Sequence, residues 1–403
     1  MWGGRTGSVA GISTSYIQGA DSLYFNPAGL VKPAPGQDLS LNVSPVTSDF
    51  SGPYNNNNDI ANSKTGFTAP VGVIYSNTLN DKFAFGVGGF ISGGSKVKYE
   101  AVNFPITGGQ PQTPVDAETD LQIGELSIGG AYKIANNLRF GLAYRYVMAR
   151  AGFTLIQRTG SAAAVANIKL TNLTDQESAL RAGLQYDLSD STHMGLTYRS
   201  EVPLKASGDI NGEAHTAGST TAFAPTTGSA NTIFPQAVTA GVDHAFNDMW
   251  KGLAEVAWTQ YSRVDAINIV GQVGTSTNPS VIQNWKDQWN ARLGAEYVGW
   301  SWPVRFGYGF TSQVTATDWA RPTFTPPGVS HTLTVGSGQT FEIMGQKLDF
   351  NGAGEYTFVS GDGTGVAAGA GTTATLPPAS NDIRAGTHKT SSFALHLNLA
   401  YNF

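Results

Sequence analysis

Alternation between apolar and polar residues at every second position restricts the fold of this chain more than any other feature. Near the end of the chain the odd positions are apolar: Phe393, Leu395, Leu397, Leu399, Tyr401 and Phe403. Successive side chains of a strand point to opposite faces, so one face of this strand would contact lipid and the other a polar lumen. The pattern recurs over residues 138–148, 285–297 and 302–310, where Trp285 and Trp289 fall on the predicted lipid face.

Composition agrees with a strand-built membrane protein. Only 13% of the 403 residues are charged, against a usual ~25%, and 40% are hydrophobic. No stretch reaches the ~18 apolar residues of a spanning helix, and lipid admits only helices and closed barrels. A soluble antiparallel sheet with one solvated face is the alternative. It is disfavoured because so many strands with an apolar, aromatic face and an Arg- or Gly-containing face would leave a soluble protein two unlike surfaces to cover. The absence of cysteine suits passage through an oxidising periplasm.

Connections alternate between short and long, as in outer-membrane barrels. Short turns are expected at residues 77–81, 135–137, 189–191, 247–248, 299–301 and 344–345. Long polar loops are expected at residues 55–64, 101–119, 159–174, 211–232, 271–283, 317–330 and 360–387. Six turns and seven loops predict an all-β, 14-stranded antiparallel transmembrane β-barrel, with the turns in the periplasm and the loops outside the cell.

Residues 1–35 lack the alternation and form a predicted unit of their own, while residues 36–403 form the barrel. The first segment opens without the apolar core of a signal peptide, so we interpret its start as mature or trimmed. It is rich in Gly and Ser, yet includes Ile12, Tyr16, Leu23 and Phe25, which is too apolar for a free tail. A barrel of this width is not filled by its own side chains, so we expect this segment to be a plug in the lumen.

Five stretches resemble the FadL family of outer-membrane transporters. The stretch 21–30, with Asn26, Pro27 and Ala28 at its centre, is similar to the plug signature of that family. Further similarities lie at residues 198–202, 258–262, 292–308 and 401–403, so the resemblance covers nearly the whole chain. It implies a Gram-negative outer-membrane location, uptake of hydrophobic molecules such as long-chain fatty acids or neutral hydrocarbons, and a hatch that closes the periplasmic side.

The resemblance also implies lateral release into the membrane through a gap at an inward kink of the third strand, residues 82–99. Gly93 and Gly94 are the candidates for this kink, because glycine inside a strand weakens pairing and marks bends. We expect the Asn26 side chain to bond backbone groups that the kink leaves unpaired. A large side chain at Gly94 would then block release.

Charged residues on inward registers predict a solvated, salt-bridged lumen: Arg139, Arg145, Arg181, Arg199, Lys251, Glu255, Lys286, Arg292, Glu296 and Arg305. His396 shares this face, and its replacement by Arg is expected to cost little. In fatty-acid members of the family, basic lumen residues hold the substrate carboxylate. Arg158 matches one of them, whereas Asn268 stands where the second would be. A neutral hydrocarbon is therefore expected to compete at least as well as a fatty acid.

Other function classes have less support in the sequence. No hydrolase, zinc-protease or P-loop motif is present, so we expect no catalytic residue, cofactor or metal. A net charge of −5 without a basic stripe argues against a nucleic-acid partner. The expected partners are a hydrophobic solute and outer-membrane lipids, and the expected state is a monomer. A passive porin for polar solutes and a structural or adhesin barrel are the alternatives.

Overall fold

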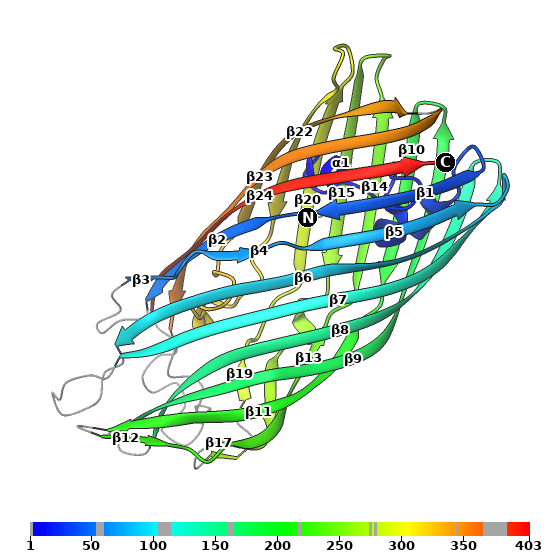
Figure 1. Ribbon diagram of the computed structural model, residues 1–403. Helices are drawn as coiled ribbons and strands as arrows, with labels where there is room; N and C mark the ends of the chain where they lie inside the picture. Colours follow the sequence, from blue (N-terminus) through cyan, green and yellow to red (C-terminus); the bar gives the residue numbers. More distant parts are fainter. Residues whose placement is uncertain are drawn as a thin grey trace.

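The chain forms a closed antiparallel β-barrel of 14 strands (Figure 1), which confirms the predicted fold class. The computed structural model describes residues 3–53, 60–103, 114–159, 164–216, 219–273, 276–277, 280–343, 345–365 and 385–403. The first and last strands close the wall, since Asp38 of β1 pairs with Asn402 of β24 and Val43 with Leu397. The lumen therefore has a continuous hydrogen-bonded wall at the seam between the two chain ends.

Several of the 14 strands are interrupted, so they carry more than one label. The first half contains β1 (Gly36–Val43), β2 (Val46–Pro53), β3 (Ile60–Asn62), β4 (Gly66–Thr68), β5 (Val71–Thr78), β6 (Phe83–Asn103), β7 (Pro114–Ala135), β8 (Leu138–Thr159), β9 (Ala164–Ser189), β10 (Thr192–Arg199) and β11 (Val202–Thr216). The second half contains β12 (Ser219–Ala222), β13 (Thr226–Phe234), β14 (Ala237–Ala245), β15 (Trp250–Thr259), β16 (Ala266–Val270), β19 (Ser280–Ile282), β20 (Gln288–Tyr297), β21 (Val304–Thr311), β22 (Ser330–Ile343), β23 (Gln346–Thr364) and β24 (Ala385–Asn402). A separate small ribbon pairs β17 (Gln272–Val273) with β18 (Ser276–Thr277).

All six predicted short turns separate consecutive strands, which confirms them. Several predicted loops are shorter than expected, because strands extend into them. β9 begins at Ala164 and β11 continues to Thr216, inside the stretches 159–174 and 211–232. Strands that rise beyond the membrane need no apolar face, so their polar sequence resembled loops.

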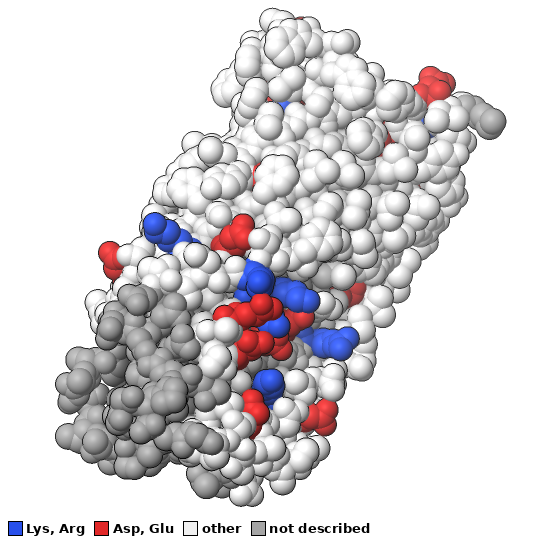
Figure 2. Space-filling model, turned by 60° about the vertical axis from the view of Figure 1, so that its left-hand side comes forward, with Lys and Arg blue, Asp and Glu red and all other residues white. Residues whose placement is uncertain are grey.

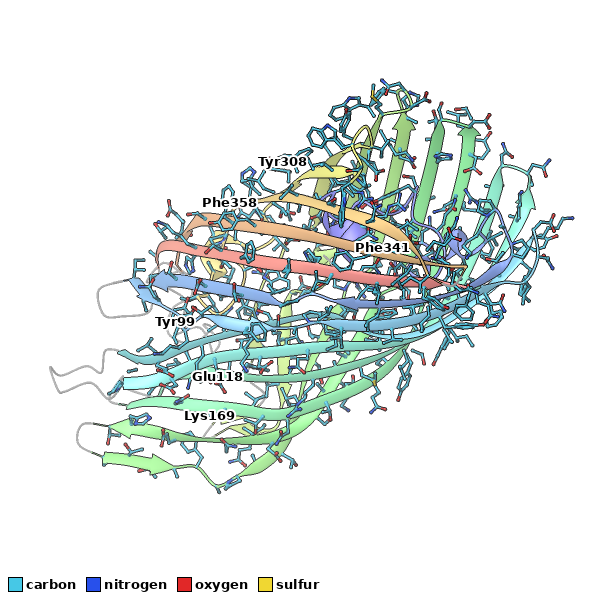
Figure 3. All side chains as sticks on the ribbon, turned by 45° about the horizontal axis from the view of Figure 1, so that its top comes forward. Tyr99, Glu118, Lys169, Tyr308, Phe341 and Phe358 are labelled. Carbon is cyan, nitrogen blue, oxygen red and sulfur yellow. The ribbon has the colours of Figure 1, made fainter. Side chains whose placement is uncertain are left out.

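The outer face of the wall carries the predicted apolar side chains. Leu395 and Leu399 are exposed, whereas His396 and Asn398 between them are buried. Tyr308, Phe341 and Phe358, labelled in Figure 3, are among the exposed aromatic side chains. Figure 2 shows a wall that is largely free of charge, with charged side chains gathered in one region. An ion pair of 3.6 Å joins Lys96, in the second half of β6, to Asp120, in the first half of β7.

Residues 3–31 pack against the inward-facing side chains of the wall. They contain α1 (Gly4–Gly7), α2 (Ser22–Phe25) and the 3-10 helix η1 (Pro27–Leu30). Ile12, Leu23 and Leu30 are fully buried, so the apolar residues of this segment have an interior environment. Further 3-10 helices are η3 (Tyr261–Arg263) and η4 (Thr317–Trp319). No helix in the described ranges is long and apolar enough to cross a membrane.

Candidate ligand-binding cavity

Asn26 connects two parts of the N-terminal segment to the barrel wall. Its Nδ2 donates to the carbonyl oxygens of Thr14 at 2.7 Å and Leu184 at 3.0 Å, and its Oδ1 accepts the Ala28 N–H at 3.2 Å. The side chain is fully buried, so these bonds replace its hydration. The expectation that Asn26 bonds the kinked third strand was wrong, because the carbonyl that it reaches belongs to β9. That partner lies 158 positions along the chain, where no local pattern points.

Four inward-facing glycines of the wall make room for the N-terminal segment, and we call them the glycine socket. A Cβ would overlap with Pro27 and Ala28 at one of them, and with Asn26, Thr14 or Ala10 at the others. The members of the socket are Gly141 of β8, Gly183 of β9, Gly195 of β10 and Gly307 of β21. Sequence reasoning missed them. The available signal was glycine recurring on the inward register of separate strands.

Polar side chains of the wall satisfy backbone groups of the same segment. Oε2 of Glu255 accepts the N–H groups of Ser13 at 3.0 Å and Thr14 at 2.9 Å. Nη1 of Arg181 donates to the Leu23 carbonyl at 3.1 Å. Irregular backbone is tolerated in an interior only when its polar groups are satisfied, and these side chains meet that need.

A bulge at Ser92 divides β6. The pairing with β7 shifts between Ile91 and Gly93, so one residue is inserted. Phe90 is buried before the bulge in the chain, whereas Val97 and Tyr99 are buried after it. The inward-facing residues of β6 therefore change from even to odd positions at the bulge. Gly94 consequently faces outward and is exposed, while a Cβ on Gly93 would meet only Ile123, at 3.6 Å.

The other edge of β6 loses its neighbour at the same level. Within the described ranges, the ladder from β5 ends at the pair Gly72–Phe90 and resumes with the isolated pair Lys64–Lys98. The Tyr24 hydroxyl donates to the carbonyl of Ser92 at 3.4 Å, and its ring packs edge-on against Phe90. The N-terminal segment thus contacts β6 beside the interruption of its ladder with β5.

A cavity of about 450 Å³ lies inside the barrel beside this bulge. Its walls are mostly apolar, and the residues that line it include Ser92, Gly93, Gly94, Ser95, Leu121, Ile123, Arg145, Val147, Ala149, Phe153, Arg199, Val202, Leu204, Phe234, Tyr261, Trp285 and Phe324. A few polar groups on apolar walls are typical of ligand sites. Trp285 was expected to face lipid, but β20 begins only at Gln288, so the alternation does not extend to Trp285.

The segment between β21 and β22 folds inward over the cavity instead of forming only an external loop. Thr323 and Phe324 line the cavity, and the hydroxyl of Tyr99 donates to the Pro322 carbonyl at 3.1 Å. Arg321 is buried and donates from Nη1 to the Ile282 carbonyl at 2.6 Å. The polar sequence of residues 317–330 gave no sign of this path.

Of the two residues expected to hold a ligand, Asn268 lies outside the cavity lining. Asn268 is exposed and accepts a bond from Ser280 at 2.8 Å, whereas the neighbouring Ile267 lines the cavity. Adjacent residues of a strand point to opposite faces, so Asn268 points away from the lumen when Ile267 points into it. Arg158 lies on β8, but its side chain falls outside the described residues.

Most of the predicted inward charges are paired. Glu125 binds Arg145 at 2.8 Å and Arg181 at 3.2 Å. Further pairs join Arg139 to Asp187, Lys251 to Asp243, Arg292 to Glu255 and Arg305 to Glu296. Lys286 departs from the prediction, because it is exposed and lies just before β20.

Comparison with known proteins shows the family to which the chain belongs. The family described as Outer membrane protein transport protein (OMPP1/FadL/TodX) matches residues 4–374. The long-chain fatty acid transport proteins of Escherichia coli K12 and Shigella flexneri are 24% identical over 271 residues, which is 58% of this chain and 58% of each of those proteins.

Solved structures extend the likeness to the whole barrel. A Pseudomonas aeruginosa FadL homologue has a TM-score of 0.77 at 14% identity, over 100% of this chain and 98% of that one. The P. putida toluene transporter TodX has a TM-score of 0.75 at 19% identity, over 99% and 97%. At these identities the likeness shows the fold.

Proposed function

Because the chain belongs to the OMPP1/FadL/TodX family of outer membrane transport proteins, we propose that it carries hydrophobic small molecules inward by lateral release. The chain is a multi-pass protein of the Gram-negative outer membrane, and its family consists of transporters, not enzymes. Solutes enter at the extracellular end, occupy the cavity, and leave sideways past the Ser92 bulge into the membrane.

The position of the cavity carries this proposal. Its lining includes Ser92, Gly93, Gly94 and Ser95, which are the residues beside the interrupted ladder between β5 and β6. An apolar solute gains about 0.8 kcal/mol for each buried CH₂, so its release into water is unfavourable. A sideways path lets the solute exchange one apolar environment for another without a fully hydrated state.

The N-terminal segment, residues 1–35, acts as the plug of the barrel formed by residues 36–403. The glycine socket and the bonds from Asn26, Glu255 and Arg181 support this role, because they hold the segment against the wall. A passive porin needs an open lumen, and a segment fixed in this way blocks one.

Relatives suggest the range of solutes. Two are named for long-chain fatty acids, and one structural neighbour is named for toluene. We propose the same broad class for this chain, namely fatty acids or neutral hydrocarbons, with the barrel working as a monomer among outer-membrane lipids. All 14 strands belong to one closed wall, so no second chain is needed to complete the cavity.

Deletion of Ser92 tests the lateral route. Without the inserted residue, Ile91 and Gly93 would follow the β7 register in sequence, and the irregularity of β6 beside the interrupted ladder would be lost. Uptake of a labelled hydrophobic solute by cells should fall to the level of cells that lack the protein. Ser92→Ala keeps the inserted residue and should transport normally.

Normal uptake through a folded Ser92 deletion would remove lateral release from the proposal. A planar-bilayer recording separates the porin alternative. The plugged transporter should remain silent, whereas a steady open conductance in the unaltered protein would support a porin.

A further inference from the structure

Three lysines form a patch on the outer face of the wall, in the extracellular half of β6. Lys96 and Lys98 lie on β6 after the bulge, and Lys64 joins them through the isolated pair that it forms with Lys98. Val97 and Tyr99 are buried, so Lys96 and Lys98 point outward. We call these three residues the lysine patch, and their side chains keep 40–66% of their surface exposed.

The height of the lysine patch corresponds to the head groups of the outer leaflet. Phe83 is exposed and begins β6 at its periplasmic end. Lys96 follows it by about 13 positions, which is roughly 33 Å along the membrane normal at ~3.3 Å per residue and a strand tilt of ~40°. The hydrocarbon core of a bilayer is about 30 Å thick, so the lysines lie just outside it.

An apolar surface continues from the lysine patch toward the hydrocarbon core. Phe67 of β4 is exposed, and β4 lies against β6 here, because a Cβ on Gly66 would overlap with the Lys96 carbonyl. Val71 and Val73 of β5 are also exposed. Cations at one end of an apolar surface suit a lipid with a phosphorylated head group, since its acyl chains can lie along the apolar residues while the phosphate contacts the lysines.

The carboxylates beside the lysine patch leave its ammonium groups available. Each lysine contacts a carboxylate at 3.2–3.6 Å, and the pairs are Lys64–Glu100, Lys96–Asp120, Lys98–Glu100 and Lys98–Asp116. Figure 2 shows basic and acidic side chains side by side on the outer wall, as such pairs require. Exposed pairs contribute little to stability, so a phosphate can replace a carboxylate at small cost. Mg²⁺ can then bridge the carboxylates to the phosphate, because both are ligands that it prefers.

We infer that the lysine patch binds the phosphate of a phosphorylated glycolipid of the outer leaflet, whose acyl chains lie along Phe67, Val71 and Val73. Lys64 and Lys98 are the pair at which the interrupted ladder beside β6 resumes, so the lipid is held next to the interruption. The inference goes beyond the proposed function, since it concerns the outer face of the wall and holds for any route of the solute.

Binding of lipid A to the purified full-length protein, in a non-ionic detergent with Mg²⁺, tests the inference. Diphosphoryl lipid A and its phosphate-free form share their acyl chains, and microscale thermophoresis measures the affinity of each. The unaltered protein should bind the diphosphoryl form at least about tenfold more tightly. The double variant Lys96→Gln/Lys98→Gln should weaken that binding about twenty-fivefold, at about fivefold for each lysine near a charged lipid, and leave the phosphate-free form within about threefold.

A second double variant separates this site from a general effect of charge. Lys82→Gln/Lys347→Gln removes two exposed lysines at the periplasmic end of the wall, with the same change in net charge, and should bind both lipids as the unaltered protein does. Lys96→Arg/Lys98→Arg keeps the charge and should retain the binding.

Three results would each overturn the lipid site: equal affinity of the unaltered protein for the two lipids, undiminished binding by Lys96→Gln/Lys98→Gln, or the same loss in both glutamine variants. None of them would contradict the proposed function, because uptake of a hydrophobic solute is a separate measurement.

Discussion

Gly141 of β8 lies directly against the peptide group between Pro27 and Ala28, so close that a Cβ on this glycine would overlap with the Pro27 carbonyl group. Glycine is therefore needed at this position because the N-terminal segment leaves no room for a side chain, and not because the conformation of β8 demands it. Glycine inside a strand weakens that strand, which makes its presence at this inward position informative.

Gly141→Val should displace the N-terminal segment while the wall remains folded. The valine side chain would occupy the space of the Pro27 backbone, and valine itself favours strands. Planar bilayers should record open events in this variant and silence in the unaltered protein. Gly130→Val is the matched control, because a Cβ there comes no closer than 3.6 Å to any neighbour. A silent trace for Gly141→Val would show that the segment does not seal the lumen.

Substitutions of Asn26 should loosen the segment in a graded order. Asn26→Ala leaves two carbonyls and one N–H without their partner, at about 1–3 kcal/mol for each buried group. Asn26→Asp is worse, because a carboxylate would face the carbonyl oxygens of Thr14 and Leu184.

The absence of native cysteine makes this order measurable. Ser8 is fully buried, so a Ser8→Cys reporter should react slowly with a water-soluble maleimide. Its labelling rate should rise from the Asn26 parent through Asn26→Ala to Asn26→Asp. Equal rates in all three would contradict the anchoring role of Asn26.

A tryptophan at Gly93 should block uptake without unfolding the barrel. Its side chain would enter the cavity, where the added Cβ meets only Ile123. Gly94→Trp is the poorer test, since a Cβ there lies 2.7 Å from the Leu121 carbonyl and would strain the ladder with β7. Uptake of labelled fatty acid should be lost in Gly93→Trp and kept in Gly130→Trp, which adds the same side chain to the outer wall. Transport by the first variant would argue against passage beside Gly93.

Leu397→Arg should destabilise the barrel by about 2–4 kcal/mol if this position lies at mid-membrane, as expected for a cation that faces lipid. Leu397→Ala, which keeps the face apolar, should cost less, and urea unfolding in lipid vesicles compares them.

The expectation that His396→Arg is harmless does not fit the structure. His396 is buried, bonds Ser44 and Glu355 at 2.9 Å each, and lies against Gly7. We now expect this inward substitution to destabilise the protein as well, through crowding instead of through lipid.

Acidification should tighten the N-terminal segment. Burial raises the pKa of Asp21 above its usual range, while bonds from Ser40 and Asn42 oppose the shift. Because the pKa of the Asp21 carboxyl is higher in the folded state than in the unfolded state, its protonation favours the folded state. This stabilisation is complete at pH values below the unfolded-state pKa, and it is lost as the pH rises through the folded-state pKa. Maleimide labelling of Ser8→Cys should therefore slow as the pH falls, relative to a free thiol control. Asp21→Asn should remove the dependence, and an unchanged dependence would assign it to another group.

The sequence was sufficient for the wall and insufficient for what the wall contains. Alternation at 393–403 is a local property, so it revealed the lipid face of β24 directly. The bulge at Ser92 inserts one residue without a change in composition, and only the register of β7 exposes it. Asn268 failed as a ligand residue for the same reason, because which of two adjacent positions faces inward depends on where each strand begins.

The contact between Gly7 of α1 and His396 of β24 joins two residues that are far apart in the chain, and Gly7 is synthesised before His396. The packing around α1 is therefore complete only after β24 has joined the barrel. Leu41 of β1 and Leu399 of β24 pair across the seam, so the wall around this segment is complete only when these two strands meet. The N-terminal segment thus acquires its full set of contacts only when the barrel closes around it.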